Sequence, residues 1–203
     1  ARYIVTIDPL SFPGLAQDAS VQELQARMKA DPNARALTTL PRITRTNAPN
    51  YYAMFGIRSA DGAHNNELRS YEAFRGGNSL HFLEGWVDFS SGSIHPELIS
   101  HNNFLKVADV KYVLVPSANG AMTVADNPAA LGRAFVVHGY TVAQADTAAV
   151  QMLLDPSFNP AKTAILDAEP DPKPSVPADS TAVSMVMNIS AGPRSFEVEA
   201  SLA

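Results

Sequence analysis

The chain has 203 residues, of which 46% are hydrophobic and 17% are charged, and its formal net charge is -5. This length fits one large domain or two small ones with a substantial core. The acidic balance argues against a nucleic-acid-binding protein, which needs a basic surface, and the lack of cysteine excludes disulfides, Cys-ligated zinc and thiol catalysis.

The first predicted elements are a strand over residues 2–7 and a helix that follows a loop containing proline and glycine. Ser20 and Glu23 have the spacing of a capping box, in which each side chain accepts a hydrogen bond from the other residue's backbone N–H. This spacing predicts a helix that starts at Ser20. The Asp31-Pro32 pair ends it, because a residue before proline disfavours helical backbone. One face of the helix carries the apolar residues Val21, Leu24 and Met28.

Residues 36–40 and 42–46 are predicted to be extended, and residues 47–62 to be irregular and rich in aromatic side chains. A short helix is predicted over residues 67–75, closed by Gly76-Gly77, because glycine readily adopts the left-handed conformation that ends helices. Another helix is predicted from Pro96 to Val107, with the proline in its first turn.

Val110–Val115 is predicted to be the central strand, buried on both faces and interrupted only by Lys111 and Tyr112. Lys111 is expected to extend its ammonium group toward one end of the sheet, which is a structural role. Thr141 and Gln144 have the spacing of a second capping box, which predicts a helix that runs to about Leu154. The remaining predicted strands are residues 122–124, 134–138, 140–142 and 163–166.

The composition changes after residue 167, because residues 168–179 contain four prolines. Such a segment is a semi-rigid linker. Residues 182–189 and 195–202 alternate between apolar and polar side chains on either side of a glycine-proline turn, which predicts a hairpin. The predicted fold class is therefore α/β or α+β. A mixed sheet flanked by a few short helices occupies residues 1–167, a proline-rich linker residues 168–180, and a β-hairpin from a truncated β-sandwich residues 181–203.

Four motifs occur in order between residues 41 and 200. The most specific is Asn102–Leu114, an asparagine followed by a leucine-containing turn and a VKYVL strand. The others are Pro41–Ile43 with Tyr51-Tyr52 and Gly56-Ile57, Gly62–His64 with Leu68–Tyr71, and Gly132–Val137 with Asp155, Phe158–Pro160 and Thr163–Leu166. This order resembles the extracytoplasmic, C-terminal region of the YfhO-like bacterial membrane proteins. Those proteins are polytopic and related to membrane glycosyltransferases that use lipid-linked sugars.

The resemblance implies a soluble extracytoplasmic domain of an integral membrane protein, on the periplasmic or cell-surface side. It implies an accessory or substrate- or acceptor-binding role in envelope glycopolymer assembly, with the protein's own transmembrane region and a glycan or lipid-linked sugar as partners. No apolar run in the chain approaches the ~20 residues that span a bilayer. In related transferases the catalytic acidic residues lie in an early loop between membrane helices, so no catalytic residue is assigned here.

The candidate ligand-binding residues combine planar amides, Arg and His groups, which pair with sugar hydroxyls, with aromatic rings, which pack against the C–H side of a sugar. They are Asn50, Tyr51, Tyr52, His64, Asn65, Asn66, Arg69 and Tyr71. The structural alternative is that the Asn and Tyr side chains fix loop backbones and that Tyr71 belongs to the core.

Neither a cofactor nor a metal is predicted. The five histidines lack the close spacing of metal ligands, and no glycine-rich phosphate-binding motif occurs. Two further functions stay open. One is a carbohydrate-binding or protein-interaction module without chemistry of its own, and the other is a stand-alone hydrolase, for which no nucleophile motif is present.

Overall fold

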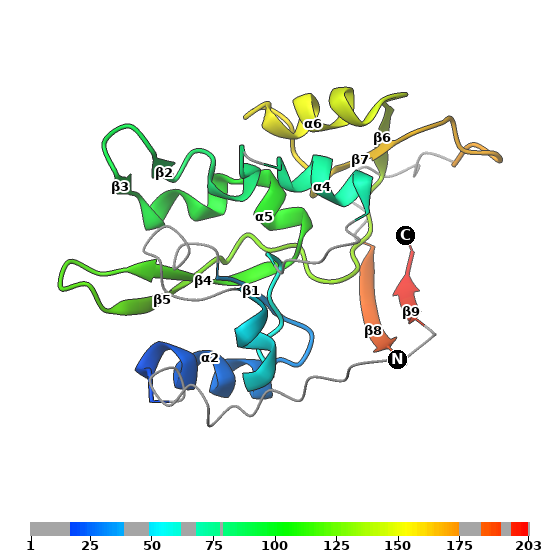
Figure 1. Ribbon diagram of the computed structural model, residues 1–203. Helices are drawn as coiled ribbons and strands as arrows, with labels where there is room; N and C mark the ends of the chain where they lie inside the picture. Colours follow the sequence, from blue (N-terminus) through cyan, green and yellow to red (C-terminus); the bar gives the residue numbers. More distant parts are fainter. Residues whose placement is uncertain are drawn as a thin grey trace, which may run out of the picture.

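The computed structural model describes residues 17–38, 49–61, 68–77, 79–174, 184–191 and 196–202 (Figure 1). These residues form a mixed three-stranded sheet, several short helices and a C-terminal antiparallel hairpin. The predicted fold class is therefore confirmed. The predicted strand over residues 2–7 and the predicted extended segment over residues 42–46 lie outside the described residues.

The central sheet has the strand order β1-β4-β5. Strand β4 (Val110–Pro116) lies between β1 (Arg35–Leu37), with which it is parallel, and β5 (Met122–Asp126), with which it is antiparallel. The predicted central strand is confirmed. Its middle residues Val113 and Leu114 are fully buried.

Neighbouring residues of β4 point to opposite faces of the sheet, and each face has its own core. Val113 packs in the cluster that contains Phe104 and Trp86, on the side of α5 (Asn103–Val107). Leu114 packs in the cluster formed with helix α2 (Ala19–Ala30). Figure 1 shows α2 on one side of the sheet and α5 on the other. Burial on both faces explains the nearly continuous apolar sequence of β4.

Helix α2 buries Val21, Leu24 and Met28, as predicted, but its start differs from the prediction. The N-cap is Asp18, whose Oδ1 accepts from the backbone N–H of Ser20 at 2.8 Å. Ser20 is itself inside the helix, with its hydroxyl donating to the same carboxylate. The predicted capping box at Ser20 is therefore wrong, because an aspartate two residues earlier supplies the capping oxygen.

The predicted helix from Pro96 to Val107 is two elements rather than one. The 3₁₀-helix η4 (Pro96–His101) ends at Asn102, where the backbone is extended, and α5 begins at the next residue. Oδ1 of Asn102 accepts from the backbone N–H of Leu105 at 3.0 Å and caps α5. The side-chain cap replaces the helical hydrogen bond that a continuous helix would have made there.

Strands β6 (Gly139–Val142) and β7 (Thr163–Leu166) form a parallel pair, and α6 (Asp146–Leu154) connects them. The prediction of a strand over residues 134–138 is wrong, because these residues are not in a strand. The strand begins at Gly139, where pairing with β7 begins. The predicted capping box at Thr141 is also wrong. Thr141 pairs with Ile165 inside the sheet, and α6 starts at Asp146 without a side-chain cap.

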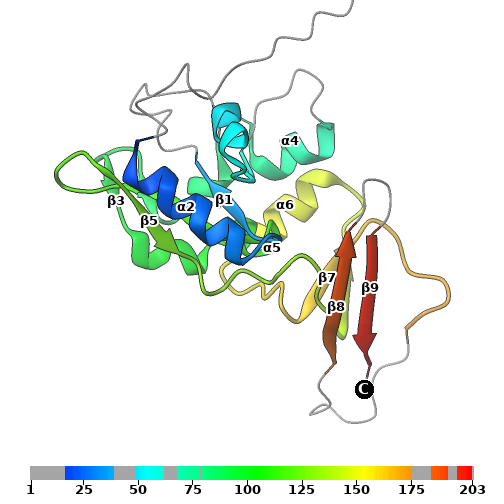
Figure 2. The same cartoon turned by 90° about the horizontal axis from the view of Figure 1, so that it is seen from below.

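The C-terminal hairpin consists of β8 (Met185–Ala191) and β9 (Phe196–Ser201), antiparallel as predicted. In both views it lies on the side of the molecule where β6 and β7 are found (Figure 2). The remaining short elements are η2 (Pro49–Phe55), α4 (Arg69–Arg75), η3 (His81–Leu83), β2 (Val87–Asp88) and β3 (Ser93–Ile94).

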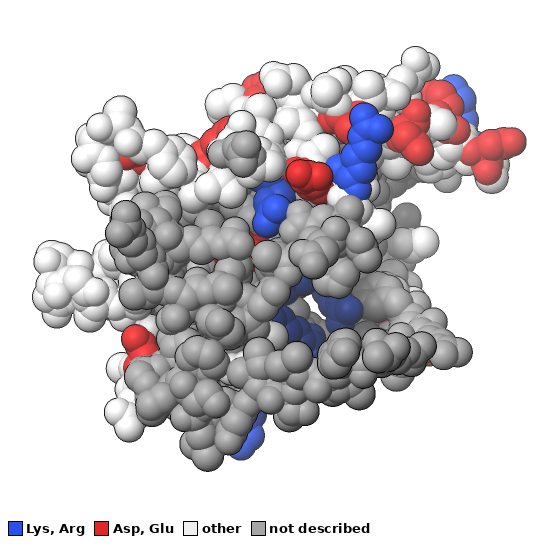
Figure 3. All heavy atoms as spheres, in the orientation of Figure 1, with Lys and Arg blue, Asp and Glu red and all other residues white. Residues whose placement is uncertain are grey.

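The described surface has mixed charge on the face shown in Figure 3. Basic and acidic side chains lie side by side over the region of α4, and acidic side chains gather over the segment that follows β7. Within the described ranges, no helix has the length and apolar character needed to cross a membrane.

Candidate functional site

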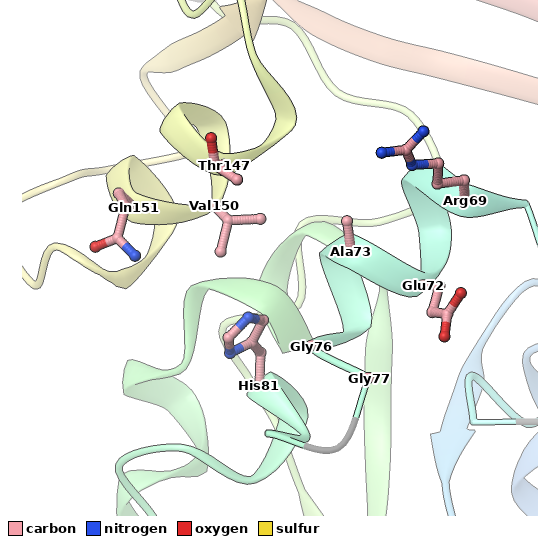
Figure 4. A pocket seen from close by; sticks show the side chains of 9 residues that line it. All are labelled: Arg69, Glu72, Ala73, Gly76, Gly77, His81, Thr147, Val150 and Gln151. Carbon is pink, nitrogen blue, oxygen red and sulfur yellow. The ribbon is translucent and has the colours of Figure 1, made fainter.

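A cavity of about 420 Å³ lies between α4 and α6 (Figure 4). Its volume falls in the range of small-molecule sites, which are roughly 300–1,000 Å³. Its lining combines small and apolar residues at the base with polar side chains around them. The lining residues are Arg69, Glu72, Ala73, Gly76, Gly77, His81, Thr147, Val150 and Gln151.

The walls of the cavity are two short helices that the core holds in place. Phe74 of α4 packs on the buried ring of Phe104, with 5.3 Å between the ring centroids. Val150 of α6 packs against the same core cluster. Gly76 ends α4 in the left-handed conformation, with φ of +88°, and the chain then turns into η3. The cavity is thus built on the core rather than on a free loop.

His81 forms the floor of the cavity and is held from three sides. Its Nδ1 lies 2.6 Å from Oε1 of Glu84. Its ring stacks on Phe104, with 4.8 Å between centroids and 22° between planes. A Cβ atom at Gly76 would lie 2.6 Å from the imidazole ring, so only glycine fits beside it. The side chain is 12% exposed. Packing and hydrogen bonding therefore fix the orientation of the ring.

The contact with Glu84 also decides which ring nitrogen of neutral His81 carries the proton. An ionised carboxylate only accepts hydrogen bonds, so Nδ1 of His81 is the donor. In the neutral imidazole, Nε2 is then an acceptor. Figure 4 shows the second ring nitrogen directed toward α6, on the side of Val150. The floor of the cavity thus offers an oriented acceptor to a hydroxyl or N–H group of a ligand.

The rim supplies the remaining polar groups. In Figure 4 the guanidinium group of Arg69 lies on the α6 side of α4, whereas the carboxylate of Glu72 points away from α6. Thr147 and Gln151 on α6 are exposed and present a hydroxyl and a planar amide. Both can donate and accept hydrogen bonds. The cavity therefore combines a cation, neutral polar groups and an oriented imidazole over a small apolar base.

Among the eight sequence-predicted site residues, Arg69 lines this cavity. Tyr52 is 3% exposed and packs in the core cluster beneath α2. Burial, together with the charges of Asp18 and Asp61, raises the pKa of Tyr52 to about 12. The hydroxyl of Tyr71 donates to the backbone carbonyl of Ala60, and its ring packs against the core.

The other five predicted residues are not brought to the cavity by any described contact. Asn50 and Tyr51 lie in η2, and their side chains are outside the described part of the structure. His64, Asn65 and Asn66 also lie outside the described residues.

Sequence reasoning missed His81, Thr147 and Gln151. His81 follows the Gly76-Gly77 helix stop, and its i,i+3 spacing to Glu84 indicates a paired histidine. Thr147 and Gln151 are one helical turn apart on α6, but nothing in the sequence places that face against α4. The contact between the two helices is long-range and appears only in the structure.

Asn102 and Lys111, which both belong to the stretch Asn102–Leu114, have structural partners. The amide of Asn102 donates to the carbonyl oxygens of His81 at 2.9 Å and Glu84 at 3.0 Å, which fixes the backbone that presents the His81–Glu84 pair. Lys111 pairs with Asp31 at 2.5 Å, at the end of α2. The structural interpretation of Lys111 is supported by this ion pair.

Two other cavities lie elsewhere in the described part of the structure. One of about 440 Å³ lies between the β6–β7 pair and the hairpin, and is mostly apolar. One of about 240 Å³ lies beside Asn102 and Leu153. In the described ranges, no cluster of three or more His, Asp or Glu side chains has a metal-binding arrangement.

Comparison of the chain with protein-family models, with curated proteins and with solved structures finds no match. The geometry of the cavity and the order of the sequence motifs are therefore the observations that bear on function.

Proposed function

We propose that the chain is an extracytoplasmic accessory domain of a multi-pass bacterial membrane protein, and that it binds a saccharide in the cavity between α4 and α6. The parent protein is of the YfhO-like, glycosyltransferase-related kind and acts in envelope glycopolymer assembly. In this proposal the domain holds substrate or acceptor and performs no chemistry, because the catalytic carboxylates belong to the membrane part.

The observation that carries the proposal is the combination of Arg69, His81 and Gln151 around one cavity. Sugars are recognised by hydrogen bonds from planar and charged groups that are fixed in orientation. Gln151 offers both a donor and an acceptor, and His81 is held by Glu84 and Phe104. The small residues Ala73 and Gly76 leave room for a sugar ring to approach the base of the cavity.

The membrane context is supported by the order of the sequence motifs, of which Asn102–Leu114 is the most specific. The proposal predicts that the gene also encodes many membrane-spanning helices. A complete reading frame without hydrophobic spans would contradict this part of the proposal and leave the binding role to be judged on its own.

A second candidate function, protein interaction, is favoured by the hairpin. Its exposed apolar residues include Met187 at 62%, Val198 at 43% and Leu202 at 72% exposure. A two-stranded hairpin is marginally stable in water. In this alternative, the hairpin therefore binds another part of the parent protein. The double variant Met187→Ser, Val198→Ser should then fold normally as the isolated chain but impair assembly of the full-length protein.

The binding role is tested by isothermal titration of the full chain with glucose, galactose, N-acetylglucosamine, glucuronate and galacturonate. We expect saturable binding of at least one of these, weakened about tenfold by Gln151→Ala, since a hydrogen-bonding group is removed from the site. The exposed Gln144, which does not line the cavity, provides the matched control Gln144→Ala. Absence of binding across the panel would contradict the proposal.

A further inference from the structure

We infer that the saccharide bound between α4 and α6 carries a carboxylate, as a uronic acid does, and that Arg69 binds this group while His81 accepts a hydrogen bond from a ring hydroxyl. This inference rests on the proposed saccharide-binding function and goes further by naming the ligand class.

The position of Arg69 is the first argument. Arg69 is the first residue of α4 and is exposed, and its guanidinium group lies on the side of α4 that faces α6 (Figure 4). A guanidinium group presents a planar fork of N–H donors that matches the two oxygens of a carboxylate. A neutral sugar hydroxyl offers one oxygen instead of two and no negative charge to pair with the guanidinium group.

The placement of the acidic side chains is the second argument. Two glutamates bear on an anion in the cavity: Glu72, which lines it, and Glu84, which contacts His81. The carboxylate of Glu72 points away from α6 (Figure 4). The carboxylate of Glu84 is hydrogen-bonded to Nδ1 of His81 at 2.6 Å, and Glu84 does not line the cavity. Thr147, Val150 and Gln151 on the opposite wall are uncharged. The charge directed into the cavity is therefore positive.

The fixed tautomer of His81 supplies the second contact. Because Nδ1–H is donated to Glu84, Nε2 of the neutral ring is an acceptor directed toward α6. A carboxylate has no hydrogen to give to Nε2, but a ring hydroxyl does. The anionic group and the hydroxyl of one uronic acid would therefore occupy different parts of the cavity. Arg69 selects the acid, and His81 contacts a group that acid and neutral sugars share.

The test compares glucuronate with glucose, which differ only at C6, by titration into the full chain and its variants. The wild-type chain should bind glucuronate about tenfold more tightly than glucose, because a charge-assisted bidentate contact is added. Arg69→Gln should abolish this preference, and Arg69→Lys should retain part of it. Arg58→Gln is the matched control, since Arg58 is exposed and does not line the cavity.

His81→Gln gives a second, independent readout. It should weaken the binding of both sugars by a similar factor, because the hydroxyl that it contacts is common to them. Equal affinity of the wild-type chain for glucuronate and glucose would overturn the inference and leave saccharide binding intact. An acid preference that persists in Arg69→Gln would also overturn it. Failure of every sugar to bind would overturn the proposed function together with this inference.

Discussion

Oε1 of Glu84 lies 2.6 Å from Nδ1 of His81, and the amide of Asn102 holds the backbone carbonyls of both residues. Asn102 also caps α5, so this one asparagine connects the start of α5 to the floor of the α4–α6 cavity. The stretch Asn102–Leu114 and the candidate site are physically connected through this residue.

The His81–Glu84 contact predicts a defined tautomer. In the wild-type chain at neutral pH, the long-range ¹H–¹⁵N spectrum should show the proton of neutral His81 on Nδ1. Glu84→Gln should give a mixture of tautomers, because an amide can both donate and accept. Glu97→Gln is the control, since Glu97 lies 3.4 Å from the exposed ring of His95 and should not affect His81. An unchanged His81 spectrum in Glu84→Gln would contradict the orienting role of the carboxylate.

Gly76→Ala should destabilise the chain more than an alanine at another left-handed glycine. Both Gly76 and Gly92 have positive φ, which costs alanine roughly 1–2 kcal/mol. At Gly76 the new Cβ would also lie 2.6 Å from the His81 ring, whereas nothing lies within 4 Å at Gly92. Overpacking typically adds roughly 1–3 kcal/mol. Equal unfolding free energies for the two variants in denaturant titrations would show that His81 does not pack against Gly76.

Asp109 is predicted to destabilise the folded chain at neutral pH. It is 3% exposed with φ of +56°, and among the described residues its Oδ1 has no hydrogen-bond partner. Burial raises the pKa of this carboxyl. Below the unfolded-state pKa of about 3.9 the carboxyl is neutral in both the folded and the unfolded chain, and the stability of the fold is fully present. As the pH rises through the raised folded-state pKa, the buried carboxyl becomes charged and this stability is lost.

Asp109→Asn should therefore increase the unfolding free energy at pH 7 by about 1 kcal/mol, since asparagine tolerates positive φ and carries no charge. The gain should shrink as the pH falls toward 4. The exposed Asp167 gives the control Asp167→Asn, which should show no comparable gain. Thermal unfolding at several pH values measures the difference, and a gain that grows on acidification would have the wrong sign.

The hairpin should be much less protected in hydrogen exchange than the central sheet. Strands β8 and β9 pair only with each other among the described strands, and the side chains of β9 that are described are exposed. Amides of such a pair open without disturbing a core. The amides of Val110–Val115 should exchange far more slowly, because that strand is paired on both edges and packed on both faces. Equal protection of hairpin and central strand would refute the prediction.

Local patterns account for the parts of the fold that the sequence predicts correctly. The apolar run of β4, the helical spacing of Val21 and Leu24, and the glycine stop at Gly76 each determine structure within a few residues. The errors arise where two local solutions compete or a distant partner decides. Asp18 and Ser20 are both good caps, and Thr141 is held in β6 by pairing with β7, far along the chain.

The same distinction applies to the candidate site. The sequence predicts Arg69 as a ligand-binding residue because arginine donates hydrogen bonds to sugar hydroxyls. Tyr71 and Tyr52 belong to the core, as the structural alternative expected for Tyr71. His81 and Gln151 face one cavity only because α4 and α6 both pack on the cluster around Phe104. This convergence depends on long-range packing, which residue types and spacing do not encode locally.

The most direct test of saccharide binding between α4 and α6 is a ¹⁵N–¹H correlation spectrum of the full chain, recorded while glucuronate is titrated. Binding in the cavity predicts saturable shifts of the amides of Gly76, Gly77 and Gln151, which line it, and no shift of the amide of Val113 in the central sheet. No shift at the cavity, or shifts confined to β8 and β9, would contradict it.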